Sequence, residues 1–527
     1  MAESGRVRQD VDVDVAIVGA GVSGVYAGWR LLGAGKAESV TVFERSERIG
    51  GRLLSLEPPG MPGVYCELGG MRFTSNQSLV VGLINELQLS THPFPVEEGP
   101  NINYLRGVQI RQQDFTDPKT ALPYTLDWAE KGMNPDDLLA YAVDQMIPGA
   151  TQMGTAQLRK FLGTYMLEGR HVYDWGFWNL LARSLSHEGY ELARATGGYD
   201  TPLMNWNALD TISLNFDLAV GVTYSAVDDG YQSLPLTIAD KFEKQGGKIE
   251  LCHELESFDV DGEGRVVLSV VDRVGGKSET REVRAGALVL AMPRRSLELI
   301  APTGPVLAPG VPKVRDLIES VTPIPLFKLC VAYPYPWWES VGVTQGRSQT
   351  DLPIRQCYYW ATGQPHGGNP DDRKSVLLAT YDDGLNVEFW NGYSDPDHHP
   401  PFAMSEAVAQ AHPPSDHWKK YNPTAAMVDE ADRQLREMHG VRVAPKPYAA
   451  AYIDWGVDPY GGGVNFWNIH ARSSQVIPAM INPVPDLPVY VCGEAYSNGQ
   501  GWVEGALETA EMVLQQHFGV TAPDWAA

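Results

Sequence analysis

The chain has 527 residues, of which 43% are hydrophobic and 20% charged, a composition typical of a globular protein with two or three domains. Its formal net charge of -24 at pH 7 argues against nucleic-acid binding, and the chain shows no membrane-seeking basic face. No apolar run reaches 18 residues, so we expect no membrane partner.

The cysteines and the start of the chain bear on the compartment. The five cysteines are scattered without CxxC or metal-ligand spacing, so each is predicted to be a small buried hydrophobe and no metal site is expected. This usage suits a reducing compartment. The first ten residues, MAESGRVRQD, lack the apolar core of a secretion signal. We therefore expect a cytoplasmic protein, or a secreted one whose signal has been removed.

The N-terminal segment predicts a strand–turn–helix–strand unit. Residues 11–18 (VDVDVAIV) have the pattern of a buried strand, and residues 25–32 that of a helix. Residues 39–44 form a second predicted strand, which ends in an acid. The G-x-G-x-x-G sequence at 19–24 lies between the first strand and the helix, which is the context that a dinucleotide-binding turn requires.

Each residue of this turn has a physical role. Gly19 permits a tight turn, Gly21 lets the backbone approach a pyrophosphate, and Gly24 lets the helix pack on the strand. The helix N-terminus then faces the phosphate charge. Glu44, twenty residues after Gly24, can accept hydrogen bonds from ribose hydroxyls. The segment therefore predicts a dinucleotide site but leaves the choice between FAD and NAD open.

The residues after Glu44 help to make that choice. Gly51 permits a second approach of the backbone, and Arg52 offers a fork of donors to a pyrophosphate. The nine-residue pattern E-x-x-x-x-x-G-G-R thus predicts a second contact with the pyrophosphate, from Gly51 and Arg52, in addition to the contact from the glycine turn at 19–24.

The rest of the chain alternates between strand and helix patterns. Residues 85–125 are mixed and rich in turns, and residues 135–217 have helical spacing, as in FLGTYML, which indicates an inserted helical subdomain. Residues 247–272 read as strand, turn and strand, and the ALVLAMP sequence at 287–293 as a buried strand. Residues 489–518, near the C-terminus, have the pattern of a strand, a loop and a helix.

Two later segments, at 326–335 and 355–362, are predicted to be strands of a larger sheet. Lys328 lies in the first of them, in the otherwise apolar sequence PLFKLC. A lysine is costly to bury without a partner, so Lys328 is a candidate functional residue.

The motifs together resemble the flavin-containing amine oxidase family. Beyond the glycine turn and the E-x-x-x-x-x-G-G-R pattern, the resemblance rests on the blocks at 67–73, 229–234, 493–497 and 501–506, so it covers nearly the whole chain. Within the family the chain is similar to the L-amino-acid oxidase branch in Gly70-Met71-Arg72 and in the sequence DLPIRQCYY at 351–359.

The resemblance implies roles for particular residues. Arg72 and Tyr359 would hold the substrate carboxylate, with Tyr358 as the alternative to Tyr359 because adjacent strand residues face opposite ways. Lys328 would lie near the reactive nitrogen of the flavin and hold a water. The carbonyl of Gly501 would bind the substrate amine, and Trp502 would lie beside the flavin.

The predicted catalytic residues are therefore Lys328, Arg72, Tyr359, Gly501 and Trp502. The predicted cofactor-binding residues are Gly19, Gly21, Ser23, Gly24, Glu44, Arg45, Gly51, Arg52, Gly70, Met71, Arg72, Leu255, Trp455, Gly493, Glu494, Trp502 and Val503. Trp206, Trp455, Phe466 and Trp467 are further candidates for the pocket wall. The 495–500 loop contains no cysteine where monoamine oxidases attach their flavin, so FAD is predicted to be non-covalent.

The fold class implied is α/β, an FAD-binding fold of the two-dinucleotide-binding type. The FAD-binding domain is predicted from residues 10–75, 228–320 and 480–516, and a sheet-based substrate-binding domain from residues 76–125 and 321–479. An inserted helical subdomain is expected at residues 126–227. The family often forms dimers, so a homodimer is one candidate for an oligomeric state that the sequence leaves open.

The function implied is oxidation of an L-amino acid by oxygen to a 2-oxo acid, ammonia and hydrogen peroxide. Two other enzymes share these motifs: a decarboxylating monooxygenase of the tryptophan 2-monooxygenase type, and an amine oxidase whose substrates have no carboxylate. A flavin-bound protein without turnover is a further alternative, which the combination of Arg72, Lys328 and the Gly501-Trp502 pair disfavours.

Overall fold

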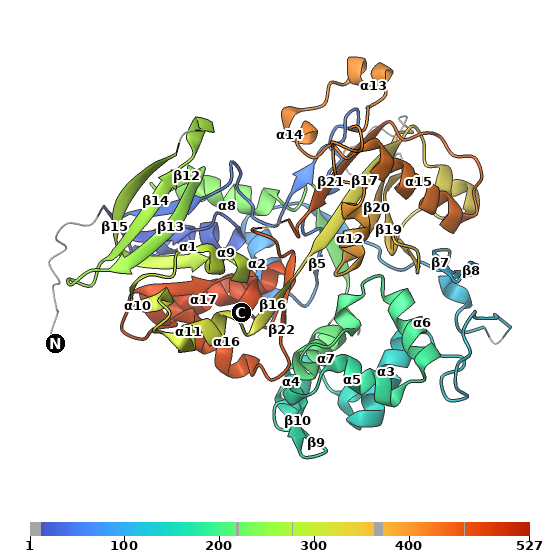
Figure 1. The fold of residues 1–527 in the computed structure, drawn as a ribbon, viewed down its shortest axis with the longest axis horizontal. Helices are drawn as coiled ribbons and strands as arrows, with labels where there is room; N and C mark the ends of the chain where they lie inside the picture. Colours follow the sequence, from blue (N-terminus) through green and yellow to red (C-terminus); the bar gives the residue numbers. More distant parts are fainter. Residues whose placement is uncertain are drawn as a thin grey trace.

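The computed structural model describes residues 12–117, 119–217, 221–276, 278–362, 373–457 and 459–526. Residues 1–11 lie outside this part of the chain, and with them the expected start of the FAD-binding domain at residue 10 and of its first strand at residue 11. Within the described part, no helix is both long and apolar enough to cross a membrane. Figure 1 shows one sheet on the left, a second sheet at the upper right and a group of helices below the second sheet.

The first sheet has seven strands in the order β12-β2-β1-β15-β14-β13, with β23 also paired to β15. The long strand β15 joins two kinds of pairing: its second half runs parallel to β1 and β23, and its first half is antiparallel to β14. The strands are β1 (Val13–Val18), β2 (Val40–Glu44), β12 (Lys248–Leu251), β13 (His253–Val260), β14 (Val266–Asp272), β15 (Glu279–Ala291) and β23 (Val489–Cys492). The predicted strands at 11–18, 39–44 and 287–293 are all present within the described residues.

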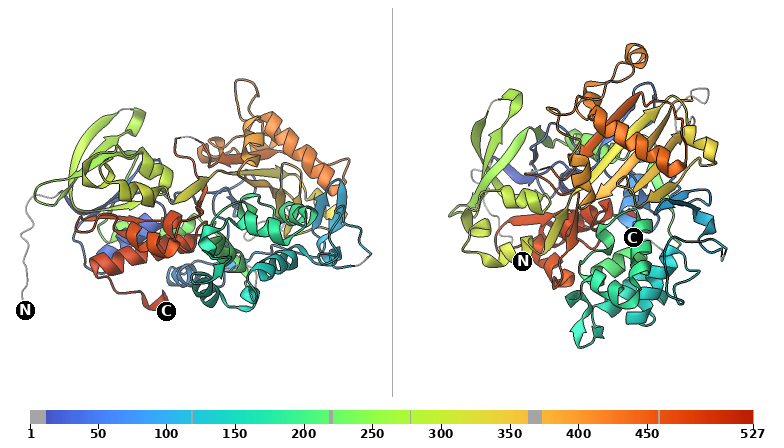
Figure 2. Two further views of the ribbon diagram at one scale, coloured as in Figure 1. Left: turned by 60° about the horizontal axis from the view of Figure 1, so that its bottom comes forward. Right: turned by 45° about the vertical axis from the view of Figure 1, so that its right-hand side comes forward.

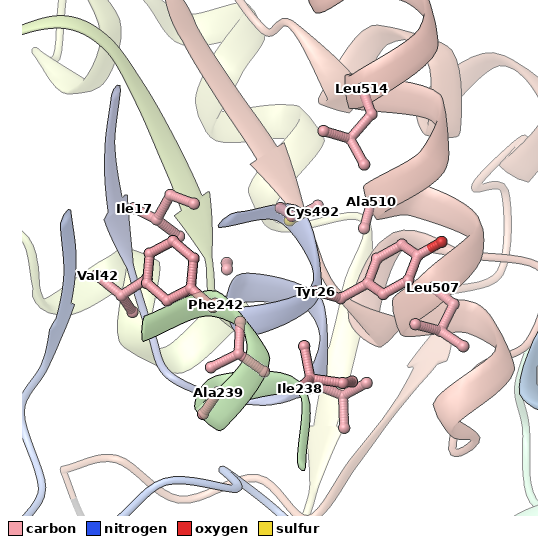
Figure 3. Close-up of a cluster of buried hydrophobic side chains, with 14 of the residues drawn as sticks. Ile17, Tyr26, Val42, Ile238, Ala239, Phe242, Cys492, Leu507, Ala510 and Leu514 are labelled. Carbon is pink, nitrogen blue, oxygen red and sulfur yellow. The ribbon is translucent and has the colours of Figure 1, made fainter. Parts of the chain in front are cut away.

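Three helices cover one face of this sheet: α1 (Val22–Gly33), α8 (Ser233–Lys244) and α17 (Val503–Phe518). Figure 3 shows this packing: Phe242 of α8 lies beside Ile17 and Val42 of the strands, and Tyr26 of α1 lies beside Leu507 and Ala510 of α17. Helix α1 begins three residues earlier than predicted, so Gly24 lies in its first turn.

The second sheet has the order β21-β17-β20-β19-β18-β7-β8. Its strands are β7 (Ile102–Leu105), β8 (Val108–Arg111), β17 (Leu326–Tyr333), β18 (Arg347–Thr350), β19 (Gln356–Thr362), β20 (Ser375–Asp383) and β21 (Ala449–Asp454). Helix α15 (Ala425–His439) lies across one face (Figure 2).

The two faces of the second sheet bury different partners. Phe327, Leu329 and Val331 of β17 pack with α15, whereas Cys330 and Ala332 pack with Leu68 and Met71 from the first part of the chain. Because side chains alternate along a strand, Lys328 lies on the same face as Cys330, toward the cofactor part.

The third part consists of helices, as predicted for residues 135–217. They are α3 (Pro135–Met146), α4 (Thr155–Leu162), α5 (Phe177–Ser184), α6 (His187–Gly197) and α7 (Ala208–Asp217), around a separate apolar core. A small sheet of β5 (Phe73–Thr74), β11 (Tyr224–Val227) and β6 (Thr91–Pro93) joins the end of this helical part to the segment that follows Arg72.

The remaining elements are short or connect the parts. They are β3 (Ser55–Leu56), β4 (Cys66–Glu67), α2 (Ser78–Glu86), β9 (Met166–Leu167), β10 (Arg170–His171), α9 (Arg294–Leu299), α10 (Gly304–Leu307), α11 (Pro312–Ile318), β16 (Val321–Ile324), α12 (Asn386–Asn391), α13 (Glu406–Ala411), α14 (Asp416–Lys419), β22 (Val464–Trp467) and α16 (Ser473–Ile481).

Candidate active site

A cavity of about 990 Å³ runs between the three parts of the molecule. All predicted site residues except Gly24 and Tyr359 line it. The cavity therefore brings together residues that lie as far apart in the sequence as Gly19 and Val503.

The glycine turn at one end of the cavity leaves no room for a side chain at Gly19 or at Gly24. Gly19 has φ +109°, and a Cβ atom on Gly24 would lie 1.9 Å from the carbonyl oxygen of Gly19. Gly24 is thus packed behind the turn, which explains why it does not border the cavity. A Cβ atom on Gly51, which has φ +57°, would lie 3.1 Å from the Cα atom of Gly21. The two turns are in direct contact and open together onto the cavity.

The groups around these turns fit a dinucleotide. No side chain from the described residues caps the N-terminus of α1, so its first amides remain available to an anion. Glu44 accepts hydrogen bonds from the amides of Ala20 and Ser46, both at 2.8 Å, which fixes its carboxylate at the cavity wall. Uncapped amides next to a held carboxylate match a pyrophosphate and a ribose.

Next to Glu44, the guanidinium of Arg45 lies over the ring of Tyr460, with 3.3 Å between the guanidinium carbon and the ring centroid. The hydroxyl of Tyr460 donates to Glu254 at 2.8 Å, and Leu255 follows in the same wall. Arg45 and Leu255 thus extend the nucleotide end of the cavity beyond the ribose position.

Glu494 connects the C-terminal segment to the glycine turns. Its carboxylate forms an ion pair with Arg52 at 2.8 Å and accepts hydrogen bonds from the amides of Gly501 at 3.0 Å and Asn465 at 3.2 Å. Arg52 also donates to the carbonyl of Gly463 at 3.1 Å. Glu494 therefore positions other cavity residues. Arg52 contacts Glu494 and Gly463 and also lines the cavity.

The turn before α17 is fixed from both sides. Gly501 has φ +81°, a conformation that favours glycine, and Trp502 stands at the N-cap of α17. Glu504 in the first turn accepts from the amides of Leu79 and Val80 at 3.0 and 2.9 Å, which joins α17 to the start of α2. Gly501, Trp502 and Val503 all border the cavity.

Lys328 is 1% exposed and points into the cavity from β17. It donates to the carbonyls of Gly69 at 2.6 Å and Glu67 at 3.2 Å, and its ammonium lies 4.2 Å from the ring centroid of Tyr381. Burial lowers the pKa of Lys328, and burial likewise raises the pKa of the neighbouring carboxyl of Glu67. A neutral form of Lys328 is therefore accessible near neutral pH.

Arg72 lies among aromatic rings. Its Nη1 donates to the hydroxyl of Tyr358 at 3.0 Å, and its guanidinium carbon lies 4.8 to 5.5 Å from the ring centroids of Phe94, Tyr224 and Tyr358. Burial alone would lower the pKa of Arg72, but the surrounding tyrosine hydroxyls outweigh it and the pKa lies above its ordinary value. Among the described residues, no carboxylate forms an ion pair with Arg72.

The structure corrects the placement of Tyr359. Its hydroxyl bonds to Ser348 at 2.6 Å and to Nε2 of His439 at 2.7 Å, on the face of the sheet that α15 covers. Tyr358, the alternative, carries the contact with Arg72. The reason is the alternation of β19: Tyr358 packs on the cofactor side, so Tyr359 must face away from it.

Other cavity residues were not predicted. Tyr199 enters from the helical part and meets Tyr381 edge-on, with 5.0 Å between ring centroids. Tyr381 stands opposite Lys328 in the pairing of β17 with β20, and Arg347 stands opposite Tyr358 in the pairing of β18 with β19. Strand register places Tyr381 and Arg347 at the cavity, and no local pattern in the sequence reveals that register or the position of Tyr199.

The aromatic candidates divide evenly. Trp455, whose indole donates to the carbonyl of Leu68 at 2.9 Å, and Phe466 line the cavity. Trp206 stacks behind Phe466 with 5.5 Å between ring centroids, and Trp467 is 2% exposed in the protein core. Neither Trp206 nor Trp467 borders the cavity, so they are wall supports and not pocket residues.

The cysteines lie away from the cavity. All five are among the described residues and unpaired, and none lines it. Burial raises the pKa of Cys492 to about 12, so its thiol is protonated at neutral pH. Non-covalent binding of FAD stays a prediction.

The fold and the dinucleotide end of the cavity define a nucleotide-dependent oxidoreductase. At the opposite end lie a buried lysine and an arginine that forms no ion pair within the part of the chain that the structure describes. A comparison with protein families gives the more specific result. The family described as flavin containing amine oxidoreductase matches residues 22–513, and the chain belongs to this family. The protein is therefore an FAD-dependent oxidoreductase that acts on amines, and the predictions of family, α/β fold and FAD are confirmed.

Individual relatives are distant. Aplysianin-A of Aplysia kurodai is 26% identical, covering 97% of this chain and 91% of that protein. The putative L-amino-acid oxidase YobN of Bacillus subtilis is 22% identical, covering 95% and 94%. Among solved structures, wild-type putrescine oxidase bound to putrescine has a TM-score of 0.64 at 17% identity, covering 96% and 99% of the two chains, which supports the fold.

Proposed function

We propose that this protein is an L-amino-acid oxidase, which uses oxygen to convert an L-amino acid to a 2-oxo acid, ammonia and hydrogen peroxide. The observation that carries the proposal is the state of Arg72. It is a guanidinium at the cavity wall, surrounded by Phe94, Tyr224 and Tyr358, with no carboxylate partner among the described residues.

A buried cation without a counter-ion is unfavourable, and a planar guanidinium binds a carboxylate by two parallel hydrogen bonds. The substrate α-carboxylate would supply the missing partner. Tyr358 accepts from Nη1 of Arg72 and donates to Gln356 at 3.2 Å, so it orients the guanidinium without neutralising it. A simple amine, which has no carboxylate, would leave Arg72 unpaired.

FAD, when bound, supplies the two-electron oxidation, so the residues of the protein must orient the substrate and handle protons. Neutral Lys328 can donate both N–H groups to the carbonyls of Gly69 and Glu67 and keep its lone pair for a proton from a water. Protonated Lys328 would offer a third N–H instead. In either state the two carbonyls fix the nitrogen at the cavity wall.

The comparisons leave the substrate class open, because they include L-amino-acid oxidases and also putrescine oxidase. The test is a hydrogen peroxide assay over a panel of L-amino acids, the matching D-amino acids and the matching decarboxylated amines. The proposal expects activity with L-amino acids and at most weak activity with amines. Preferred turnover of amines would reject it.

Arg72→Ala sharpens this experiment. A hydrogen bond to a charged group contributes about 1.5–3 kcal/mol, so kcat/KM for L-amino acids should fall by about one to two orders of magnitude with FAD retained. The matching amines should lose far less. An equal loss for both substrate types, or loss of FAD, would assign Arg72 to the cofactor.

Product analysis separates oxidation from decarboxylating monooxygenation. An oxidase gives a 2-oxo acid and peroxide, whereas the monooxygenase gives an amide and carbon dioxide. We expect the 2-oxo acid, and amide as the main product would replace the proposal by this alternative. Light scattering of the holoenzyme tests the homodimer, which is one candidate for the oligomeric state.

A further inference from the structure

A second arginine lines the same end of the cavity. Arg347 stands on β18 directly opposite Tyr358, so its side chain lies on the cavity face of the sheet. Arg72 donates to the Tyr358 hydroxyl and Arg347 is its partner in the strand pairing, and both arginines lower the pKa of that hydroxyl against the opposing effect of burial. No motif in the sequence singles out Arg347.

The donors of Arg347 are poorly satisfied. Its side chain is 10% exposed, and its Nε is buried without a hydrogen-bond partner among the described residues. Nη1 reaches the carbonyl of Gly197 only at 3.5 Å and the amide oxygen of Gln356 at 3.4 Å. Nη2 donates to Glu97 at 3.1 Å, but Glu97 is 41% exposed. A guanidinium with an orphaned Nε is incomplete as a purely structural group.

The charges at this end of the cavity favour an anion on the inside. Arg72 and Arg347 supply two cationic groups, and Lys328 adds a third only when it is protonated. The inner acid Asp383 already accepts from the amides of Asp200 and Thr201, both at 2.9 Å, and burial raises its pKa. The outer acids Glu97 and Asp136 are exposed to solvent, which weakens their attraction for a cationic substrate.

We propose that Arg347 binds a carboxylate on the substrate side chain, so that the preferred substrate is a dicarboxylic L-amino acid held by Arg72 at one end and Arg347 at the other. This inference rests on the proposed function, since it assigns the α-carboxylate to Arg72. It adds a specificity-determining residue and a substrate class.

The test uses L-glutamate and L-glutamine, which have nearly the same shape and differ in the side-chain charge. We expect kcat/KM to be at least about tenfold higher for L-glutamate. Arg347→Met should lower kcat/KM for L-glutamate by about one to two orders of magnitude and that for L-glutamine by less than about threefold. Arg347→Lys, which keeps the charge but not the fork of donors, should recover part of the loss.

Glu97→Gln is the matched control. It removes the ion-pair partner of Arg347 without touching the guanidinium, so L-glutamate turnover should be unchanged or higher. If Arg347 only supports Glu97, then Glu97→Gln and Arg347→Met will have the same effect, and the inference fails. Thermal shift of the holoenzyme gives a readout besides turnover: glutarate should raise the Tm more than butyrate does, and Arg347→Met should abolish the difference.

The outcomes separate the two proposals. Peroxide from L-glutamine or L-methionine at rates equal to or above L-glutamate overturns the dicarboxylate inference and leaves the oxidase proposal standing. Preference for L-lysine or L-arginine would assign the side-chain site to Glu97 and Asp136 instead. Equal loss for L-glutamate and L-glutamine in Arg347→Met also overturns the inference. Turnover of amines alone rejects the proposed function itself.

Discussion

The two ends of the cavity are built from different materials. The cofactor end consists of backbone turns in contact, where Gly19 and Gly24 leave no space for a Cβ atom and one on Gly51 would be crowded. The substrate end consists of long side chains, including Arg72 and Tyr381, that converge from separate segments. The comparison shows that a nucleotide site can be encoded in one local stretch, whereas a substrate site depends on how distant strands are paired.

The largest expected effect concerns the cofactor end. Gly24→Ala would place a Cβ atom 1.9 Å from the carbonyl of Gly19, and backbone cannot move aside cheaply. We expect loss of nearly all bound FAD, measured as the ratio of flavin to protein absorbance, together with a lower Tm.

Gly262→Ala is the control, because a Cβ atom there meets nothing within 4 Å and Gly262 has no positive φ. This variant should bind FAD normally. Normal FAD content in Gly24→Ala would show that the turn is less constrained than its geometry indicates, and the contrast between the two ends would be lost.

The next effect concerns chemistry at the substrate end. Lys328→Met keeps the length of the side chain but removes its donors and its lone pair beside the cavity. We expect flavin reduction by substrate, or its reoxidation by oxygen, to slow by about 100-fold with FAD still bound. Stopped-flow measurement of both half-reactions tests whether Lys328 takes part in the chemistry, since unchanged rates in both would remove Lys328 from the active site.

The same contrast explains what the sequence could predict. The glycine turn, Glu44 and the buried Lys328 are local patterns whose physical reasons need no knowledge of the fold. The prediction that Tyr359 holds the substrate carboxylate is wrong. The sequence shows that Tyr358 and Tyr359 face opposite sides of a strand, but it does not show which side α15 covers. Arg347 was missed because only the register of β18 with β19 sets it opposite Tyr358. Tyr199 comes from the helical part, which no local pattern places at the cavity.

A third prediction tests the covered face of the second sheet. Nδ1 of His439 must donate to the carbonyl of Leu435 at 2.6 Å, so neutral Nε2 accepts from the hydroxyl of Tyr359. Tyr359 in turn accepts from Ser348, which accepts from the amide of Ile102 at 2.8 Å. The chain of hydrogen bonds is complete only while His439 is neutral.

Burial lowers the pKa of His439 from 6.5 to about 4, and Arg111 acts in the same direction. The unfolded chain therefore takes up the proton first, so the stability contributed by neutral His439 is present above pH 6.5 and is lost as the pH falls toward 4. At about 1.4 kcal/mol for each pH unit, the loss is about 3 kcal/mol.

His439→Gln does not titrate, so it should be less stable than the wild type at pH 7 and lose less stability on acidification. Urea unfolding of the holoenzyme between pH 7 and pH 4.5 measures the difference. Parallel pH profiles for the two proteins would exclude His439 as the source of acid sensitivity.

The smallest effect separates the two neighbouring tyrosines, and with them the two faces of β19. Tyr358→Phe removes one neutral hydroxyl that orients Arg72, which contributes about 0.5–1.5 kcal/mol, so kcat/KM for L-amino acids should fall by about 2- to 12-fold. Tyr359→Phe instead leaves Ser348 and His439 with unmet partners on the covered face, which should cost about 1–3 kcal/mol of stability and leave the kinetics unchanged. Steady-state kinetics and Tm, measured on both variants, should therefore show opposite patterns. If Tyr359→Phe is the variant that lowers kcat/KM while its Tm is retained, the cavity face of β19 has been assigned to the wrong tyrosine. The pairing of Arg347 with Tyr358 would then no longer support a contact between Arg347 and the substrate.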